Sequence, residues 1–487
     1  MIALINKKTD YLDRLAYWSI LFLVLFVPFE DFILKFLPVS DKIYFYARFM
    51  SELLVYAASA TIIIKRFLRE RSLAKTPLDT PIFVLLQIMF ISAIANNSGL
   101  FETLVNIRPV FRYTFLFYLV VNLKMTPLRA SKILNYCIYA GVGQLIIGLV
   151  QWLSRGALDS LLAPRASELD VGGVGKDFVL LSGREIGSIY GAAGDTILFA
   201  SFMILFLILI LSKMYIANHK IAQSNRSNTE KISLKTKNII FALLVAGTVF
   251  ATAFTYARIC IFVCLGAIIG YTCLKFYRRD RMAILLIVLS LLVPLTVFTV
   301  SVVPDLVQTE YAGNARREEQ SVIQDTTGIF TKEYVENARQ QRLGAVIDIP
   351  LTVIFNRPFF GFGPDQLQTI DSINKSKTDF LTRKWEKEAF NDVYWSATMA
   401  YYGVVGFLAM AWIFYRLQKW ARIIYRRTRN KVLKELSLSV IAIAFITMIL
   451  LFFNQFIEFR IYGLYFWLLP GLIFNLYYQE KFGSLQK

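Results

Sequence analysis

Histidine, cysteine and charged residues are all scarce in this chain of 487 residues. It has one histidine and four cysteines, and only 18% of its residues are charged. A metal site built from several histidines is therefore excluded, as is a proton relay between two histidines. The cysteine content is too low for a disulfide scaffold. A disordered chain is excluded because 56% of the residues are hydrophobic. An ordinary soluble enzyme is excluded as well, because such a protein would carry about 25% charged residues.

Long apolar runs take the place of the missing charge. The mean hydropathy is +0.53, and most runs approach the ~20 residues that a helix needs to cross a bilayer. We therefore predict an all-α polytopic membrane protein with about twelve transmembrane helices. The predicted spans are residues 15–37, 43–64, 80–95, 107–122, 133–153, 188–212, 238–255, 257–274, 282–303, 394–415, 436–455 and 459–478.

The net charge of +19 indicates how the chain is oriented in the membrane. With both termini in the cytoplasm, well over half of the Lys and Arg residues fall in the inner loops and termini, for example in residues 65–75, 275–281 and 416–434. The positive-inside rule accounts for this excess, so no nucleic-acid partner is predicted. The cysteines all lie in predicted spans and are interpreted as small buried apolar residues. They are Cys137, Cys260, Cys264 and Cys273.

Two connections are long, and both face outward on this topology. Residues 154–187 interrupt the first nine spans (residues 1–303), and residues 304–393 separate them from the last three spans and the cytoplasmic tail (394–487). The second loop has helical spacing of apolar residues until Pro350, followed by a Gly-rich turn at 360–364. We predict a partly helical cap on the outer face. No internal repeat is visible, which weighs against transporter folds built from repeats.

Ionisable residues within the predicted spans lie mostly in the outer half, where they mark paired ions or a functional site. Arg48 and Glu52 are four residues apart and are expected to pair with each other. Arg108 and Arg112 share one helix face with no acidic residue close in sequence, so they favour an anion. A structural ion pair is the main interpretation of Glu458 and Arg460, between the last two spans.

Arg258 is the only charged residue in the apolar stretch 238–274, which is long enough for a helical hairpin. An arginine at the tip of such a hairpin is suited to a phosphate, because its planar fork binds two oxygens and keeps its proton. Arg339 and Arg342, on one predicted helix face, and Arg357 add positive charge to the large loop. A solvated charged face is the alternative explanation for these three.

Three stretches together resemble the O-antigen ligase/polymerase superfamily, the Wzy/WaaL-like membrane glycosyltransferases. The first is residues 254–259, and the second is Arg342-Leu followed by 356–364. The third is residues 390–394 followed by 402–407, and residues 184–195 are a weaker match. The stretches span about residues 184–407, and the remainder is similar only in topology.

The resemblance implies a metal-independent, cofactor-free glycosyltransferase of the bacterial inner membrane, with a GT-C-like fold and a periplasmic active site. Its donor and acceptor would be oligosaccharides on undecaprenyl diphosphate, and a flippase and a chain-length regulator would be partners. The resemblance favours Arg258 and Arg342 as the catalytic arginines, with Arg184 and Arg339 as support on the diphosphate. Arg108 and Arg112, whose shared helix face favours an anion, are further candidates for binding the diphosphate. Asp392 and Glu388 are the expected proton acceptors.

One departure from the family concerns Phe390, which stands where many relatives carry a histidine. The only histidine here, His219, lies in a predicted cytoplasmic loop. This favours a polymerase that joins repeat units over a ligase that needs the histidine. A ligase with another base, a lipid-linked oligosaccharide transporter and a non-catalytic scaffold remain as alternatives.

Overall fold

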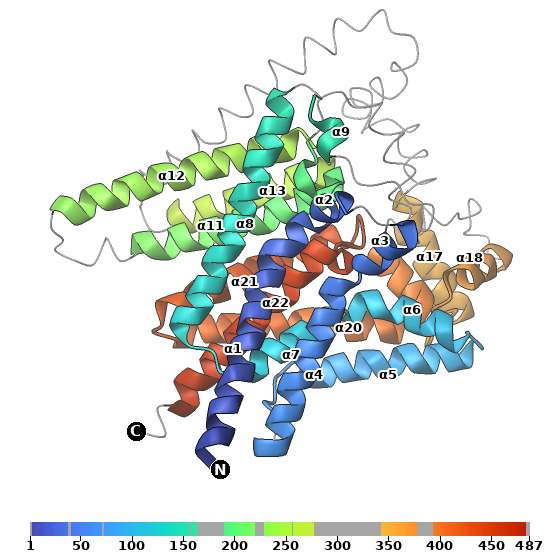
Figure 1. Cartoon of the computed structure of the whole chain (residues 1–487). Coiled ribbons are helices and arrows are strands. Elements are labelled where there is room, and N and C mark those ends of the chain that lie inside the picture. The colour runs from blue at the N-terminus through green and yellow to red at the C-terminus, as the bar shows by residue number, and fades with distance from the viewer. Residues whose placement is uncertain are drawn as a thin grey trace, which may run out of the picture.

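All regular elements in the described part of the chain are helices. The computed structural model describes residues 2–37, 40–70, 73–154, 157–162, 189–219, 228–255, 257–276, 342–376 and 393–483. The first and the last described helices both reach the lower left in Figure 1. The all-α fold class is therefore confirmed for these residues. The expected span 282–303 and most of the two long loops lie outside them.

The first 162 residues form a series of helices joined by short connections (Figure 1). They are α1 (Ile2–Phe26), the 3₁₀ turn η1 (Val27–Phe29), α2 (Glu30–Lys35), α3 (Asp41–Ala47), α4 (Met50–Glu70), α5 (Asp79–Ala95), α6 (Leu100–Phe111), α7 (Thr114–Asn122), α8 (Pro127–Leu153) and α9 (Asp159–Leu162).

The remaining described residues add eight α-helices and two 3₁₀ turns. They are η2 (Gly191–Ala193), α11 (Thr196–His219), α12 (Asn228–Ala253), α13 (Arg258–Phe276), α17 (Arg342–Asn356), α18 (Gln366–Lys375), α20 (Tyr394–Arg427), α21 (Lys431–Leu450), η6 (Phe456–Glu458) and α22 (Arg460–Gly483).

Six of the described helices are long and apolar enough to cross a membrane. The number rises to seven if α6 and α7, which meet at an angle of 52°, form one bent span. The chain is thus an α-helical, multi-pass membrane protein by length and composition. The number twelve stays a prediction, because helices such as α5 and the apolar part of α13 are shorter than a full span.

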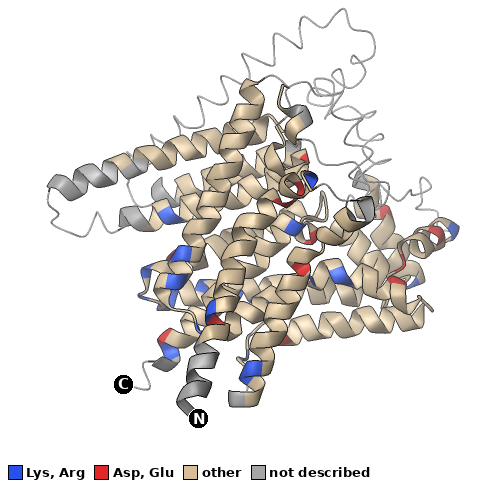
Figure 2. Ribbon diagram, in the orientation of Figure 1, with Lys and Arg blue, Asp and Glu red and all other residues tan. Residues whose placement is uncertain are grey.

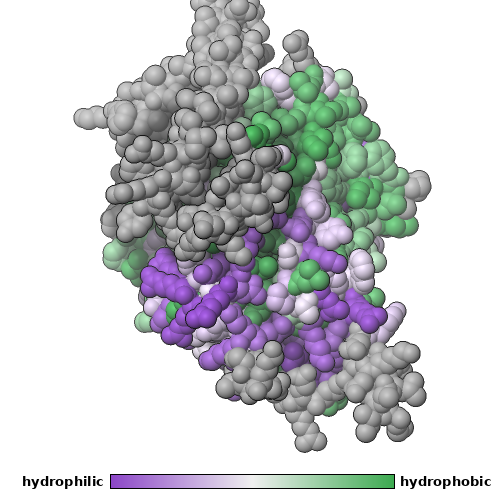
Figure 3. Space-filling view, turned by 90° about the vertical axis from the view of Figure 1, so that its left-hand side faces the viewer, coloured by the Kyte–Doolittle hydropathy of each residue, from purple (hydrophilic) through white to green (hydrophobic). Residues whose placement is uncertain are grey.

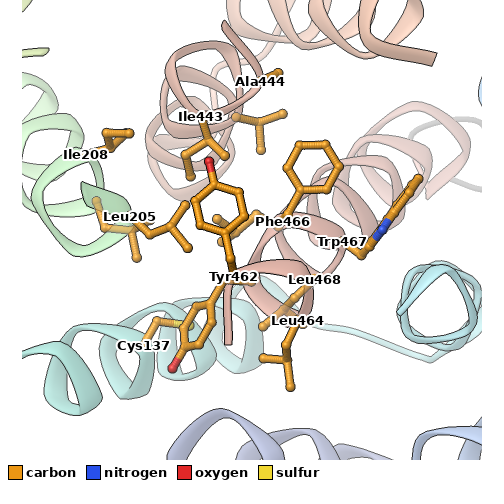
Figure 4. Close-up of a cluster of buried hydrophobic side chains, with 14 of the residues drawn as sticks. Cys137, Leu205, Ile208, Ile443, Ala444, Tyr462, Leu464, Phe466, Trp467 and Leu468 are labelled. Carbon is orange, nitrogen blue, oxygen red and sulfur yellow. The ribbon is translucent and has the colours of Figure 1, made fainter. Parts of the chain in front are cut away.

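The core is built around α11 and α22, the most deeply buried of the membrane-span candidates. A helix that is apolar on all sides is stable only when other helices surround it. Figure 4 shows Leu205 and Ile208 of α11 and Cys137 of α8 around Tyr462 and Phe466 of α22. Cys137, Cys260 and Cys264 are buried free thiols, as expected, whereas Cys273 is exposed and departs from the prediction.

Basic side chains gather at one end of the molecule, where α20 ends, α21 begins and α22 ends (Figure 2). Thr428 joins two of these helices by donating to Glu480 over 2.6 Å. In Figure 3, hydrophilic residues occupy the lower part of this face and hydrophobic residues lie above them. The exposed basic residues are Lys419, Arg422, Arg426, Arg427, Arg429, Lys431 and Lys481.

Helix α20 is broken at Gly403, where the backbone has φ 69° and ψ −173°. The break frees backbone groups that a continuous helix would pair internally. The Gly-rich turn after α17 supplies their partners, because Phe362 N–H donates to the Ala400 carbonyl (2.8 Å) and Gly363 N–H to the Tyr401 carbonyl (3.1 Å). In the other direction, Val404 N–H donates to the Pro358 carbonyl over 2.8 Å. We call this contact the turn–helix junction.

Pro350 does not interrupt its helix, contrary to the sequence-based expectation. Helix α17 runs from Arg342 to Asn356 with Pro350 inside it. A proline removes one backbone donor and disfavours the helix interior, but here the buried face formed by Ala345, Ile349 and Val353 packs against α18 and α20. Tertiary packing therefore outweighs the local preference.

Replacing Gly403 by alanine is expected to destabilise the protein by about 3 kcal/mol or more, since this backbone region is accessible almost only to glycine. A Cβ atom at this position would also collide with the Phe359 carbonyl oxygen. Thermal unfolding in detergent, followed by tryptophan fluorescence, measures the effect. Gly266→Ala is the control, because a Cβ atom there meets nothing within 4 Å. Equal melting temperatures for the two variants would contradict the strained break.

Candidate functional site

Three arginines converge on the buried carboxylate of Glu52, in the first turn of α4. Arg108, in the last turn of α6, lies 3.2 Å from it, and Arg112, at the bend between α6 and α7, lies 3.0 Å away. Arg460, the first residue of α22, lies 3.9 Å away. These four side chains are called the Glu52 cluster. It holds one negative and three positive charges.

Two further carboxylates extend the Glu52 cluster toward α2. Arg460 also reaches Glu30 at 3.4 Å, and the Ser51 hydroxyl donates to the same carboxylate over 2.8 Å. Asp31 pairs with Arg48 at 3.2 Å. The carboxylates of this end thus neutralise much of its positive charge, which is the condition under which charges persist inside a membrane protein.

Arg108 and Arg112, which have no acidic residue close in sequence, share an acidic partner from α4, about sixty residues earlier in the chain. One sequence-based expectation about these residues is wrong. Arg48 and Glu52 do not form the expected pair on one helix, because Arg48 pairs with Asp31 and Glu52 faces the arginines of other helices. The 52° bend after α6 carries the two arginines against α4, and spacing within one helix cannot reveal this.

Arg108 is the most accessible arginine of the Glu52 cluster. Its side chain is 35% exposed, compared with 8% for Arg112. The guanidinium of Arg108 lies over the Phe49 ring, with 4.5 Å between its central carbon and the ring centroid. One edge of Arg108 is thus held by Glu52 and Phe49, and its remaining donors are available to an anionic ligand.

Glu458 lies beside this cluster, in the 3₁₀ turn η6 between α21 and α22. Burial raises the pKa of Glu458 to about 7, and the nearby Arg112 guanidinium opposes part of that rise. On the other side, Glu458 is close enough to Tyr394, Tyr401 and Tyr402 of α20 to interact with them electrostatically. The expected pairing of Glu458 with Arg460 is not found, because Arg460 faces Glu30 and Glu52.

The turn–helix junction is fixed to the end of α5 by polar side chains. The Ser92 hydroxyl lies 2.6 Å from the Phe360 carbonyl and 2.7 Å from that of Tyr401. Asn96 donates to the Gly361 carbonyl over 3.2 Å and accepts a hydrogen bond from Arg357. Neither Ser92 nor Asn96 was predicted to have a role, because isolated small polar residues at a helix end give no sequence signal.

Arg258 is the first residue of α13, as expected for a residue at the tip of a helical hairpin. Only its backbone is described. The positive end of the helix dipole disfavours a cation and favours an anion at this place. Two residues further on, Cys260 is close enough to Asp195 and Tyr462 to interact with both electrostatically. The tip of the hairpin therefore lies near the start of α22.

The other predicted site residues are described only in part. Arg342 begins the described part of α17, and its side chain is outside that part. Arg184, Arg339, Glu388 and Asp392 all lie outside the described residues. Within the described ranges, no group of three or more His, Cys, Asp or Glu residues is placed to hold a metal ion.

Comparison with known proteins adds no relative. No protein-family model matches the chain, and no curated protein matches it.

Replacing Glu52 by glutamine is expected to lower the free energy of unfolding by roughly 3 kcal/mol, since it leaves buried guanidinium groups without their counter-charge. Chemical denaturation in detergent measures the change. Glu102→Gln, on the exposed side of α6, is the control and is expected to change stability by less than about 0.5 kcal/mol. Equal stability of the two variants would contradict a central role for Glu52.

Glu458→Gln is expected to change the pH dependence of stability. Because the folded protein holds a proton on Glu458 up to a pKa of about 7, above the ordinary 4.5, the stability of the wild type falls as the pH rises between these values. Glutamine cannot ionise, so the variant should exceed the wild type by about 1–3 kcal/mol at pH 8. At pH 4.5 the difference should vanish. Melting temperatures at several pH values measure it, and a constant difference would contradict the shifted pKa.

Proposed function

We propose that this chain is a polysaccharide polymerase of the bacterial inner membrane. It crosses the membrane twelve times, with both termini in the cytoplasm, and the exposed basic end of α20–α22 faces inward. The Glu52 cluster and the turn–helix junction then face the periplasm. There the enzyme joins oligosaccharide repeat units that are carried on undecaprenyl diphosphate.

The observation that carries this proposal is the turn–helix junction. Two of the stretches that resemble the ligase/polymerase superfamily, residues 356–364 and 402–407, meet there: Val404 N–H donates to the Pro358 carbonyl, and two further backbone hydrogen bonds connect residues 362 and 363 to Ala400 and Tyr401, just before the second stretch. These stretches are about forty residues apart in the sequence, and their contact supports their interpretation as parts of one site. Glu458 connects this junction electrostatically to Arg112 and thus to the Glu52 cluster.

The arginines supply the charge that the reaction needs. An acceptor hydroxyl oxygen bonds to the anomeric carbon of the donor sugar, the bond from that carbon to the diphosphate oxygen breaks, and the lipid diphosphate leaves with the electron pair. Arg258 and Arg342 bind the diphosphate and stabilise this developing charge. Arg108, supported by Arg112, and Arg184 and Arg339 are further ligands of the diphosphate. Fixed guanidinium groups perform this role with no metal or cofactor.

A polymerase is favoured over a ligase because Phe390 replaces the histidine on which the ligases rely. A flippase supplies the lipid-linked units, and a chain-length regulator acts beside the enzyme.

The test is polymerisation in nanodiscs, with the undecaprenyl-diphosphate-linked repeat unit from the same cell as substrate. The wild type should produce a glycan ladder on a gel. Arg258→Ala and Arg342→Ala should each reduce the rate by about 100-fold or more, because each removes a charge from the leaving group. Arg422→Ala, at the opposite basic end, is the matched control and should keep the wild-type rate.

Other outcomes would favour the alternatives. Transfer of the glycan to an added acceptor that lacks a lipid diphosphate would indicate a ligase. The absence of any product, from a substrate that another polymerase uses, would indicate a transporter or a scaffold.

A further inference from the structure

Helix α17 carries its polar residues on the inside and its apolar residues on the outside. Asp348 and Thr352 are the only polar side chains between residues 344 and 355, and both are fully buried. Ile354 and Phe355 are exposed, and the other side chains of this stretch that are not buried are apolar as well. A surface helix in water has the opposite arrangement, with polar residues on its outer side. The outer side of α17 is therefore suited to an apolar environment.

The Gly-rich turn and the start of α18 continue this apolar surface. Phe359, at the beginning of the turn, is 68% exposed, and Leu367, in the first turn of α18, is 66% exposed. Further along α18 the exposed side chains are polar, at Gln368, Asp371 and Lys375. The apolar surface thus extends over α17 and the turn and ends on α18, where a polar surface begins.

The apolar surface adjoins the ends of α5 and α20, two apolar helices (Figure 1). Helix α17 packs against α20, which is long and apolar enough to cross a membrane. The Gln368 side chain donates to the Asn96 carbonyl over 3.1 Å, so the start of α18 lies against the end of α5. Leu100 and Phe101, which follow this end of α5, are also exposed. The surface is therefore continuous with the outer surface of the membrane helices.

The length of α20 sets the depth of the turn–helix junction in the membrane. Lys419, an exposed residue of the basic end, follows Gly403 by 16 residues, which is about 24 Å of helix. Residues 404–415, between them, include no charged residue. The hydrocarbon of a bilayer is about 30 Å thick. A helix that has Lys419 at one boundary of the hydrocarbon therefore places Gly403 just inside the opposite boundary.

The backbone of the turn is paired with other parts of the protein, as this depth requires. Irregular backbone is stable inside a membrane only where protein groups pair with it. Four carbonyl groups between residues 358 and 363 accept hydrogen bonds. Their partners are the Val404 N–H and the side chains of Ser92, Asn96 and Thr369. These bonds remove much of the cost of placing the turn in hydrocarbon.

We propose that α17 and the Gly-rich turn form a shallow re-entrant segment in the bilayer, in the leaflet opposite the basic end of α20–α22. Lipid acyl chains are the partner of its outer surface and cover Ile354, Phe355 and Phe359. With 15 residues, α17 is shorter than the ~20 residues of a spanning helix, and a mostly polar stretch, residues 336–341, precedes it. The segment therefore enters beside α20, reverses at the turn and returns to the same aqueous side along α18. This placement is independent of the proposed glycosyl transfer.

Spin labels on single cysteines test this placement in lipid nanodiscs. Cys273→Ser is the background, because Cys273 is exposed and the other three cysteines are buried. Leu408→Cys, at an exposed position of α20, is the hydrocarbon reference, and Lys375→Cys is the water reference. Each labelled protein is first shown to melt at the temperature of the background protein. The labels under test are at three exposed positions, so that one misfolded variant leaves the comparison intact: Ile354→Cys, Phe355→Cys and Phe359→Cys.

The measured quantity is the collision rate of each label with oxygen, divided by its collision rate with a polar nickel chelate. At the three test positions this ratio should exceed that at Lys375 by at least about threefold, because oxygen enters hydrocarbon and the chelate does not. It should lie within about threefold of the ratio at Leu408, since both sites are then in hydrocarbon.

Two results would overturn the placement. Ratios equal to that at Lys375 would show that the surface is in water. Low collision rates with both reagents would show that another part of the chain, or a second copy of it, covers the surface. Because the measurement needs no substrate, a wild type that makes no glycan ladder would overturn the proposed function and leave this placement standing.

Discussion

This end of the molecule depends on the ion pairs that the buried carboxylate of Glu52 forms with three arginines. Arg108 and Arg112 come from the end of α6 and Arg460 from the start of α22, and without a shared counter-charge they would repel one another in surroundings that screen charge poorly. Glu52 makes their approach favourable. Because Arg460 also binds Glu30, the same network fixes α2, α4, α6 and α22 relative to one another.

A second constraint is the need to pair backbone groups inside a membrane. The break at Gly403 is tolerated because residues of the Gly-rich turn provide donors and an acceptor for the freed groups. Ser92 of α5 and Asn96, which directly follows α5, complete the arrangement. The ion network and this backbone pairing meet at Glu458, which interacts electrostatically with Arg112 and with the tyrosines of α20.

Hydropathy predicted the helices well, because an apolar run of suitable length is a local property. Every predicted span in the described part of the chain corresponds to one helix or a closely spaced pair. Partners between helices were not predictable in this way. The nearest cation to Glu458 in sequence is Arg460, yet Arg460 pairs with Glu30, at the other end of the chain. Helix formation through Pro350 and the break at Gly403 likewise depend on tertiary contacts.

The turn–helix junction also has a consequence for biosynthesis. Residues 358–363 leave the ribosome before α20 is made, so the donors and the acceptor that the broken helix requires are already present when it enters the bilayer. If α20 preceded the Gly-rich turn in the chain, its carbonyl groups at the break would be unpaired in the bilayer until the turn was synthesised. The order of elements along the chain thus suits insertion from the N-terminus and would make a circular permutation between α18 and α20 difficult to insert.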